Sequence, residues 1–297
     1  MTGLKWTRKT TEKIADELGN LHIDVSSKTV ARLLKKMDFL LRVNHKKLSS
    51  GSKNDQGERD EQFVYIAGLK EEFSSNGDPV VSVDTKKKEM VGNFKNSGDA
   101  WNKEPVLVKD HDFRSESDGM AVPYSVYDVQ ANRGSVCVGM SSDTAEFAVD
   151  SIVNWWSSEG MHSYPKAEKL LILADGGGSN GFRNRAWKSN LQEHFCDRYQ
   201  IAVTVCHYPT GASKWNPVEH RLHSEISKNW AGRPLNSYET IVNYIRTTKT
   251  ATGLKVNACL VEKTYETGIK TSDAEMAALS LYPHDTQPKR NYTLHPR

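Results

Sequence analysis

Three acidic residues stand where their side chains could combine to bind metal ions: Asp84, Asp175 and Glu219. Asp84 directly follows the β-branched run at 79–83, and Asp175 directly follows the apolar run at 170–174. Sites in open α/β sheets form at strand ends, so the two aspartates are expected to meet at one edge. Carboxylate oxygens bind hard divalent cations, and two such cations can clamp an in-line phosphoryl displacement. The pattern therefore permits a metal-dependent phosphoryl-transfer site.

The same residue types also allow structural roles. An aspartate at the end of a strand is often a turn or helix-cap residue. Asn216 and Pro217 suit the N-cap and first position of a helix, and Glu219 lies three residues after Asn216, at the spacing of a capping box. Glu225 is a second acidic candidate on this helix, but at about 100° per residue it points to another side. Spacing alone leaves both the capping role and Glu225 open.

A glycine loop, DGGGSN at 175–180, follows the second of these strands. Such loops can bind phosphate, but this one matches neither the dinucleotide-binding motif nor the P-loop. We expect the glycines to let the backbone approach metal or DNA closely. His207, His220 and His223 are also near the predicted site, and His223 is on the same helix face as Glu219. A zinc site stays open as an alternative, although these residues form no tight zinc motif.

The elements that position these residues follow from hydrophobic patterning. Strand-like runs lie at 79–83, 123–130, 134–140, 170–174 and 201–206. Residues 88–94 are a candidate hairpin partner of the first run. Helices are predicted at about 143–156, after the glycine loop, and from Asn216 onward. Several strands followed by alternating helices and strands predict a mixed α/β sheet of the ribonuclease-H type rather than a doubly wound fold.

The first 50 residues are basic. They hold 11 Lys and Arg against 5 Asp and Glu, whereas the whole chain has a net charge of only +3. Helices are predicted at 7–19 and at about 28–38, the second of them capped by Ser26 or Ser27. Four basic residues lie opposite the apolar stripe of the second helix: Lys28, Arg32, Lys35 and Lys36. This outline is that of a small helix-turn-helix, and its charge indicates a polyanion such as DNA as partner.

These patterns divide the chain into three parts. Residues 1–47 are the predicted helix-turn-helix region, the polar residues 48–60 a linker, and residues 61–297 the α/β domain with a C-terminal helical extension. A helix is expected at about 60–75. No run of about 18 apolar residues predicts a membrane span, and the basic N-terminus lacks a signal-peptide core. The four cysteines are too sparse for a disulfide scaffold, so a cytoplasmic protein is expected.

Four long segments and the C-terminal tail carry a family resemblance: VSVDTKKKEMVGNFKN (81–96), DTAEFAVDSIVNWW (143–156), ADGGGSNGFRNRAWK (174–188), VCHYPTGASKWNPVEHRL (205–222) and NYTLHPR (291–297). Together they resemble the Rhodopirellula-type transposases of ISAzo-type insertion sequences, over nearly the whole chain. The resemblance implies a DDE transposase with a ribonuclease-H-like core, distantly similar to mariner-like transposases. Those relatives carry their last carboxylate in an N-P-x-E segment. It matches residues 216–219 here, so the resemblance favours Glu219 over Glu225.

The resemblance implies the transposase of an insertion sequence, which cleaves DNA at the element ends and transfers the strands into target DNA. Asp84, Asp175 and Glu219 are then the expected catalytic metal ligands, for two Mg²⁺ ions with Mn²⁺ as a substitute. The expected partners are terminal inverted repeats and target DNA at the prokaryotic nucleoid, bound by a homodimer. The alternatives are a non-catalytic DNA-binding protein derived from a transposase and a ribonuclease-H-type nuclease without strand transfer.

Basic residues near the predicted site are candidate contacts to DNA phosphates. Lys86 and Lys88 follow the first aspartate, and Arg183, Arg185 and Lys188 follow the glycine loop. Either group could instead be a solvated surface, which the sequence alone does not exclude.

Overall fold

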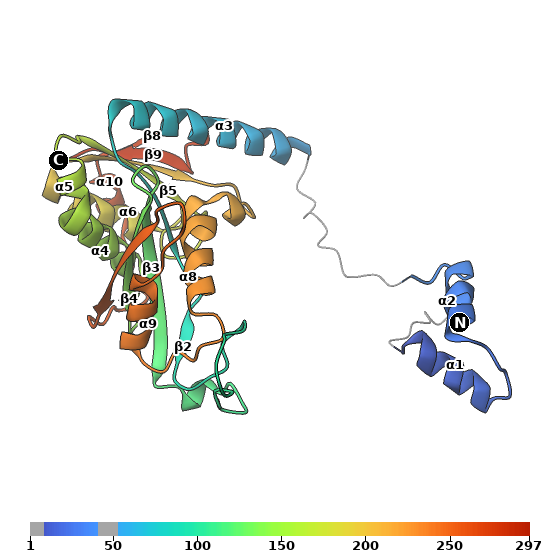
Figure 1. Cartoon of the computed structure of the whole chain (residues 1–297). Coiled ribbons are helices and arrows are strands. Elements are labelled where there is room, and N and C mark those ends of the chain that lie inside the picture. The colour runs from blue at the N-terminus through green and yellow to red at the C-terminus, as the bar shows by residue number, and fades with distance from the viewer. Residues whose placement is uncertain (1–8, 41–52) are drawn as a thin grey trace. The chain divides into compact units, whose positions relative to one another are not determined.

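The structure is a computed structural model that describes residues 9–40 and 53–297 (Figure 1). Residues 9–40 belong to one compact unit and residues 53–297 to another. Among the helices described in these two ranges, none has the length and apolar character that crossing a membrane requires.

The first unit contains two helices, α1 (Thr11–Asn20) and α2 (Ser27–Lys36). Thr10 caps the first and Ser26 caps the second, each by accepting a hydrogen bond from the backbone N–H three residues further on. The second helix and its cap agree with the prediction. The predicted start of the first helix at residue 7 is wrong, because Thr10 has an extended backbone and caps a helix that begins at Thr11. The four basic residues predicted for DNA binding are all exposed: Lys28, Arg32, Lys35 and Lys36.

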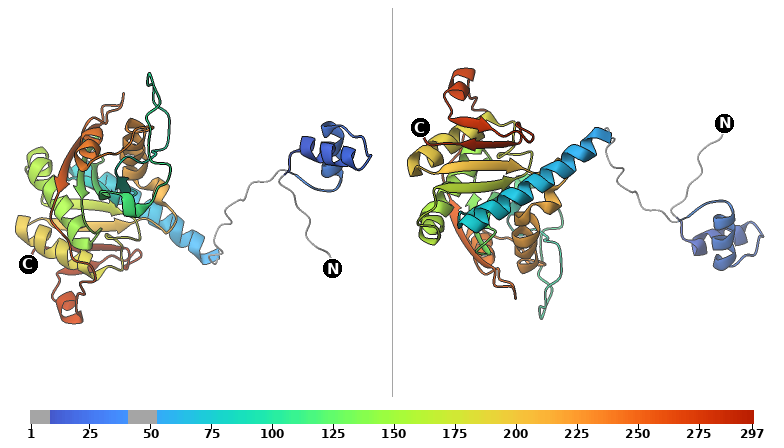
Figure 2. Two further views of the ribbon diagram at one scale, coloured as in Figure 1. Left: turned by 90° about the horizontal axis from the view of Figure 1, so that it is seen from below. Right: turned by 90° about the horizontal axis from the view of Figure 1, so that it is seen from above.

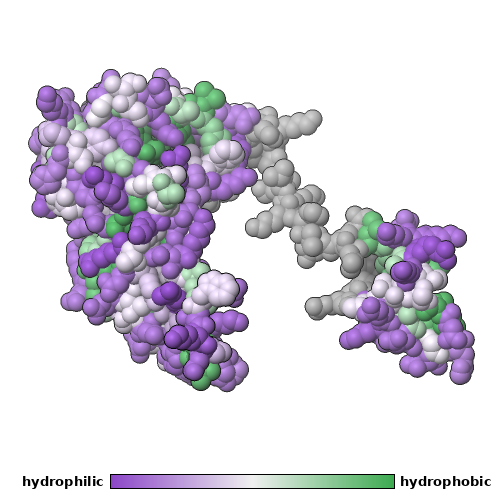
Figure 3. All heavy atoms as spheres, viewed as in Figure 1, coloured by the Kyte–Doolittle hydropathy of each residue, from purple (hydrophilic) through white to green (hydrophobic). Residues whose placement is uncertain are grey.

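The second unit is built on one mixed sheet, to which residues 53–297 contribute nine strands. They are β1 (Val80–Thr85), β2 (Glu89–Val91), β3 (Gly119–Asp128), β4 (Arg133–Gly139), β5 (Lys169–Ala174), β6 (Ala202–His207), β7 (Lys255–Val261), β8 (Leu281–Pro283) and β9 (Asn291–Leu294). Their order is β7-β4-β3-β1-β5-β6-β9-β8, with β2 beside β3. The exposed surface of this unit in Figure 3 is mainly hydrophilic, with small apolar areas.

The pairing confirms the predicted mixed sheet of the ribonuclease-H type. β3 runs antiparallel to both β1 and β4, whereas β1, β5 and β6 are parallel neighbours. The predicted hairpin between β1 and residues 88–94 is wrong, because β2 pairs with β3 instead. Both edges of β1 are already occupied by β3 and β5, so the chain after Thr85 has no free edge of β1 to return to.

Helices cover both faces of the sheet (Figure 2). The helices of this unit are α3 (Lys53–Asn76), α4 (Ala145–Trp155), α5 (Met161–Ser163), α6 (Arg185–Asn190), α7 (Asp197–Tyr199), α8 (Ser224–Asn229), α9 (Tyr238–Arg246) and α10 (Asp273–Ala277). Short turns complete the set: the 3₁₀ turns η1 (Arg114–Glu116) and η4 (Ser213–Trp215), and the π-helical turns η2 (Trp156–Gly160), η3 (Leu191–Cys196) and η5 (Glu219–His223).

Strand alternation divides the buried apolar residues between two layers. Val81 and Val83 share a core with α4 and α6, whereas Val80 shares one with α3. A third core joins β3, β4 and β7 to α8 and α9, and half-buried Val129 packs against both this core and that of α3. The helices α3, α8 and α9 therefore cover one face of the sheet, and α4 and α6 cover the other.

The predicted linker at 48–60 is partly wrong. Its first residues, 48–52, lie outside the described residues, but α3 begins at Lys53 rather than at about 60. The first turns of α3 are polar and carry no apolar stripe, because the helix begins to contact the sheet only further along, where Gln62, Ile66 and Phe73 are buried. Hydrophobic periodicity in a sequence can identify only the part of a helix that packs against the core.

The predicted C-terminal helical extension is also wrong. After α9 the chain adds β7 in parallel to β4, and then β8 and β9, with β9 antiparallel to β6. The helix of this region, α10, has only five residues. Tyr292 and Leu294 of β9 are buried in the main core, so the last residues of the chain complete the sheet.

Candidate functional site

The two aspartates of the predicted site lie side by side. Val83 of β1 is the register partner of Ala174 of β5, and Asp84 and Asp175 are the next residue on each chain. Strand alternation places Asp84 on the same face as Val80, which is the face covered by α3 and α8. Asp175 reaches the same region, because its Oδ1 atom accepts a 3.4 Å hydrogen bond from Asn216. The structure thus brings together two of the three predicted residues directly through the sheet.

Asn216 connects the third acidic segment to β1. Its side chain is fully buried, donates to Val83 O at 3.3 Å and to Asp175, and accepts a hydrogen bond from the Ser82 hydroxyl. Ser82 Oγ also accepts a 2.9 Å bond from Val218 N. The structural alternative for this segment, a capping box between Asn216 and Glu219, is therefore wrong. The Asn216 amide bonds to the buried strand rather than to the helix, and Ser82 satisfies a backbone donor of the turn.

Glu219 begins the π-helical turn η5, which places it next to Asp84. Ligand atoms of Asp84, Glu219 and His223 all lie within 4.8 Å of one another. His223 Nδ1 is 3.9 Å from Glu219 Oε2. Single π-helical turns inside helices are frequent at functional sites. Glu225, the other acidic candidate, instead forms a 2.6 Å ion pair with Lys228.

His223 is the residue of this cluster that the sequence analysis considered only for the zinc alternative and not among the predicted catalytic residues. Its side chain is buried, and its Nε2 atom has no hydrogen-bond partner among the described residues. Burial lowers the pKa of His223, so its imidazole is neutral and a nitrogen lone pair is available. The signal for this residue was its position four residues after Glu219, which had suggested only a zinc alternative.

The carboxylates repel one another in a partly buried environment. Burial, a hydrogen bond shared with Glu219 and the negative charge of Asp175 raise the pKa of Asp84 to about 8. The neighbouring His223 imidazole lowers the pKa of Glu219, which keeps that group ionised. In the absence of metal, a proton on Asp84 reduces the repulsion between the carboxylates. A bound divalent cation would neutralise the same negative charge. Oxygen donors, an available nitrogen and excess negative charge fit Mg²⁺ or Mn²⁺.

Asp84→Asn is expected to raise the stability of the metal-free protein. In the unfolded chain Asp84 ionises near pH 4, but in the fold only near pH 8. Folding must therefore take up a proton between these values, and the stability of the unchanged protein falls as pH rises through them. Asparagine carries no such penalty. A gain of at least about 1 kcal/mol, or about 2–4 °C in Tm, is expected near pH 8.

Thermal unfolding in a chelator, near pH 4 and near pH 8, measures this effect. The gain should shrink toward the lower pH and also when Mg²⁺ replaces the chelator. Asp110→Asn is the matched control, because the side chain of Asp110 is 91% exposed and distant in sequence from the cluster. An equal Tm for Asp84→Asn and the unchanged protein near pH 8 would contradict the prediction.

A hollow of about 480 Å³ opens beside the cluster, lined by Glu219, His223, Lys86 and Trp230 among others. Lys86 is buried, 3.2 Å from Glu89, and its ammonium lies 4.5 Å from the centre of the Trp230 ring. Burial lowers the pKa of Lys86. Lys88, predicted to act with it, is exposed. The hollow therefore places the Lys86–Glu89 ion pair beside the carboxylates.

The three basic residues predicted after the glycine loop have different surroundings. Arg185 pairs with Asp273 at 2.6 Å, and Lys188 is half-buried with its ammonium 5.0 Å from the centre of the Tyr292 ring. Arg183 is exposed beside the Phe182 ring. Two of the three predicted contacts are thus already engaged within the fold.

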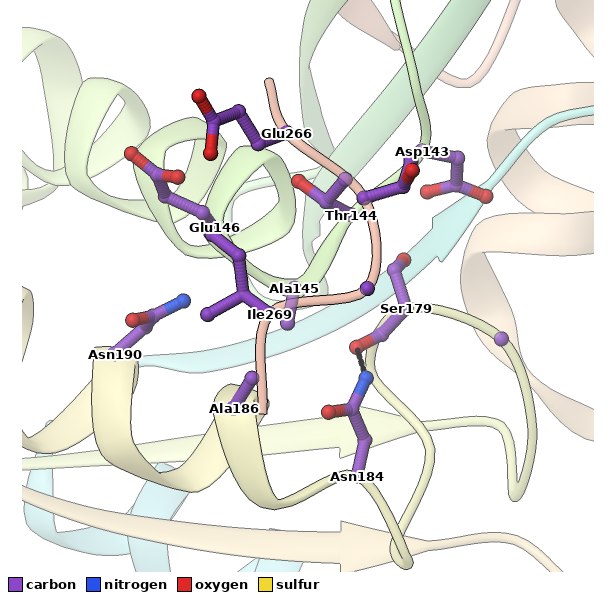
Figure 4. Close-up of a pocket in the computed structure, with 13 residues that line it drawn as sticks. Asp143, Thr144, Ala145, Glu146, Ser179, Asn184, Ala186, Asn190, Glu266 and Ile269 are labelled. Atoms are coloured by element: carbon purple, nitrogen blue, oxygen red, sulfur yellow. Dashed lines mark hydrogen bonds between the residues drawn. The ribbon is translucent and has the colours of Figure 1, made fainter. Parts of the chain in front are cut away.

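A second cavity, of about 340 Å³, is lined in part by Gly178 and Ser179 of the glycine loop (Figure 4). Asp143, Glu146 and Glu266 line it, and Asp143 accepts a 3.1 Å hydrogen bond from Thr85, the residue after Asp84. Its walls carry acidic rather than basic side chains, which disfavours a phosphate backbone. The hollow at Lys86, by contrast, contains the basic side chains of Lys86 and Lys87.

Solved structures similar to this chain include complexes of the Mos1 transposase. The Mos1 transposase paired-end complex with left transposon end has a TM-score of 0.49 and 14% identity, covering 80% of this chain and 65% of that one. The mariner Mos1 paired end complex with Mg has a TM-score of 0.48 and 13% identity, covering 80% and 65%. This chain thus spans less than two thirds of their length. A comparison with curated proteins found no match.

The family comparison covers far more of the chain. Residues 1–296 match the family model described as Rhodopirellula transposase DDE domain. The match includes the three carboxylates at the strand ends and the turn, and it confirms the resemblance seen in the sequence motifs. The chain belongs to the Rhodopirellula transposase DDE domain family.

Proposed function

We propose that this protein is an active DDE transposase, which cuts DNA at the ends of an insertion sequence and joins those ends to target DNA. Family membership supports this chemistry. The observation that carries the proposal is the convergence of Asp84, Asp175 and Glu219 at one end of the sheet, next to a hollow that contains a buried lysine. The experiment that tests it is metal-dependent cleavage of terminal-repeat DNA.

Asp84, Asp175 and Glu219, with His223 beside them, would hold the divalent cations: two Mg²⁺ ions, for which Mn²⁺ can substitute. When bound, such ions polarise the scissile phosphodiester, lower the pKa of the attacking water and stabilise the leaving oxygen. No serine or tyrosine nucleophile is needed for this chemistry, because water and then the freed 3′-hydroxyl are the attacking groups.

The residues around the carboxylates position them. Asn216 holds Asp175 against the end of β1, and Ser82 fixes the turn that carries Glu219. The side chains of Asn216 and Ser82 are fully buried, so the surrounding packing keeps them in the rotamers that make these hydrogen bonds. Lys86 places a positive charge in the hollow where a DNA phosphate would approach, and exposed Lys88 would contact the backbone further out.

The partners of the proposed activity are the terminal inverted repeats of the element and its target DNA. Exposed Lys28, Arg32, Lys35 and Lys36 on α2 support DNA binding by residues 1–47 as a helix-turn-helix region. Two element ends must be brought together for insertion, so we propose a homodimer on DNA. Because the substrate is DNA, we place the activity in the cytoplasm, at the nucleoid.

His223→Ala is expected to weaken Mn²⁺ binding more than Mg²⁺ binding. An imidazole nitrogen is a better ligand for Mn²⁺ than for Mg²⁺, which prefers oxygen donors. Loss of the imidazole should lower Mn²⁺ affinity by about tenfold or more. Calorimetric titration of both ions into the full chain measures the difference. His220→Ala is the control, since His220 is exposed. Equal losses for the two ions would argue against metal ligation by His223.

A further inference from the structure

Arg290 reaches back from the C-terminal part of the chain to the catalytic edge of the sheet. It directly precedes β9, and its guanidinium donates to Tyr208 O at 3.2 Å and to Thr210 Oγ1 at 3.4 Å. Tyr208 N in turn donates to Ala174 O at 2.9 Å, one residue before Asp175. The guanidinium is thus anchored to the segment that borders the predicted catalytic aspartate.

The backbone of Arg290 is held to the glycine loop through a buried histidine. The two ring nitrogens of His207 lie 2.9 Å from Arg290 O and 2.9 Å from Asn180 O. Burial lowers the pKa of His207 to about 4, so the ring stays neutral and donates from one nitrogen only. With the proton on Nε2 the ring donates to Asn180 O, while the backbone N–H of His207 donates to Arg290 O at 3.2 Å. The start of β9 and the end of the DGGGSN loop are therefore fixed relative to each other.

Gly176, the residue after Asp175, leaves space for the guanidinium. A Cβ atom at this position would lie 3.3 Å from Arg290 Nη1 and 3.6 Å from the Phe182 ring. Contacts at 3.3 Å are tighter than ordinary van der Waals packing, so a side chain here would displace the arginine. The glycine thus has a specific local role: it allows Arg290 to approach the chain next to Asp175.

Two arginines share the Phe182 ring. The guanidinium carbon of Arg290 is 4.6 Å from the ring centre, and that of Arg183 is 5.1 Å away. Such contacts are favourable for each cation, but the two positive charges repel each other. Burial, and then the charge of Arg183, lower the pKa of Arg290. An anion bound between or beside them would relieve this repulsion.

Neither arginine is neutralised by an ion pair within the described ranges. Arg185 and Arg297 have carboxylate partners at 2.6 and 2.7 Å, Asp273 and Asp197. For Arg183 and Arg290, by contrast, the described residues provide no carboxylate within salt-bridge distance. Guanidinium groups bind phosphate oxygens in bidentate geometry. Their planar arrangement of N–H donors suits them to phosphodiesters.

We propose that Arg183 and Arg290, held around Phe182, form a binding site for the phosphodiester backbone of DNA beside Asp175. This inference rests on the proposed function, and it assigns to the C-terminal segment a part in holding the substrate. Arg290 is a positioning residue: it fixes a phosphate near the scissile bond and takes no part in bond making. Arg183, of the residues predicted after the glycine loop, is the one retained in this role.

The salt dependence of DNA binding tests the proposal. Each phosphate contact that is lost should reduce the slope of log K against log salt concentration by about 0.9. The full chain and its variants Arg290→Gln, Arg183→Gln and the double variant are each titrated in chelator with a short labelled DNA duplex of random sequence at several salt concentrations. Arg290→Gln and Arg183→Gln should each reduce the slope by the amount expected for one lost phosphate contact, and the double variant by the amount expected for two.

Two further variants separate charge from structure. Arg290→Lys keeps the charge and should largely restore the slope. Arg297→Gln is the matched control, because Arg297 is also a C-terminal arginine but pairs with Asp197, and its slope should equal that of the unchanged protein. A merely structural role for Arg290 would weaken binding without changing the slope, and that result would overturn the proposal.

Cleavage by the unchanged protein is measured in parallel to keep the two hypotheses apart. If the protein cuts DNA but the slope is insensitive to Arg183 and Arg290, the phosphate site is wrong and the proposed function stands. If the slopes change as expected but no cleavage occurs with Mg²⁺, the phosphate site is supported and the catalytic proposal fails. Absence of any DNA binding by the unchanged protein would contradict both.

Discussion

Asp84→Asn, Asp175→Asn and Glu219→Gln are each expected to abolish Mg²⁺-dependent cleavage of DNA that carries the element's terminal repeats. Each change removes a negative oxygen ligand while keeping the size of the side chain. A loss of at least about 10³-fold is expected, which corresponds to about 4 kcal/mol of transition-state stabilisation. Nicking of an end-labelled duplex, followed by assay of joining to a second duplex, measures both steps.

Glu225→Gln is the matched control for the third carboxylate. Glu225 lies on α8 only six residues after Glu219, but its side chain is paired with Lys228. It should retain full activity. If Glu225→Gln loses activity and Glu219→Gln keeps it, the assignment of the third ligand is wrong. Nicking without joining would favour a ribonuclease-H-type nuclease, and binding without metal-dependent nicking would favour a non-catalytic DNA-binding protein.

Asn216→Ala is expected to impair both the fold and the reaction. The substitution removes the amide that bonds to Val83 and Asp175 and leaves the Ser82 hydroxyl without its acceptor in a fully buried place. Buried polar groups without partners cost about 1–3 kcal/mol. Loss of a group that orients a metal ligand typically lowers activity by about 10–100-fold. Chemical unfolding and the cleavage rate of the folded protein measure the two effects.

Asp128→Ala separates these effects. Asp128 is also buried, and it accepts hydrogen bonds from two backbone N–H groups and from Tyr164. It pairs with Val81, near the start of β1, whereas Asp84 lies near its end. This variant should lose comparable stability but keep its cleavage rate per folded molecule. If both variants lose activity in proportion to stability alone, the positioning role of Asn216 is refuted.

The candidate site was partly predictable because strand ends are visible in the sequence. The β-branched run before Asp84 and the apolar run before Asp175 are buried strands, and parallel pairing at Val83 and Ala174 brings the two aspartates together. Glu219 was identified by a sequence motif, while its local explanation as part of a capping box was wrong. In sequence, a polar residue before a helix looks like an N-cap. In the structure, the Asn216 side chain instead donates a hydrogen bond to the backbone of buried β1.

Other parts of the site were not predictable, because they depend on contacts between segments far apart in the chain. His223 becomes a candidate ligand only when η5 packs against the end of β1. Arg290 is about a hundred residues from Phe182 and Gly176 in sequence, yet their contact defines the proposed phosphate site. Local patterns contain no information about such pairs.

The sequence by itself determined the strands and helices with strong periodicity, the mixed sheet, the basic N-terminal region and the two acidic residues at strand ends, Asp84 and Asp175. These features depend on local residue order, namely on the alternation of buried side chains and on polar residues at element ends. Only the tertiary structure decided which edges pair, that the last residues form β9 rather than a helical extension, and which polar groups hold the carboxylates. The physical reason is that hydrogen-bond partners and neighbouring charges are set by the packing of distant segments, where each buried polar group must be satisfied.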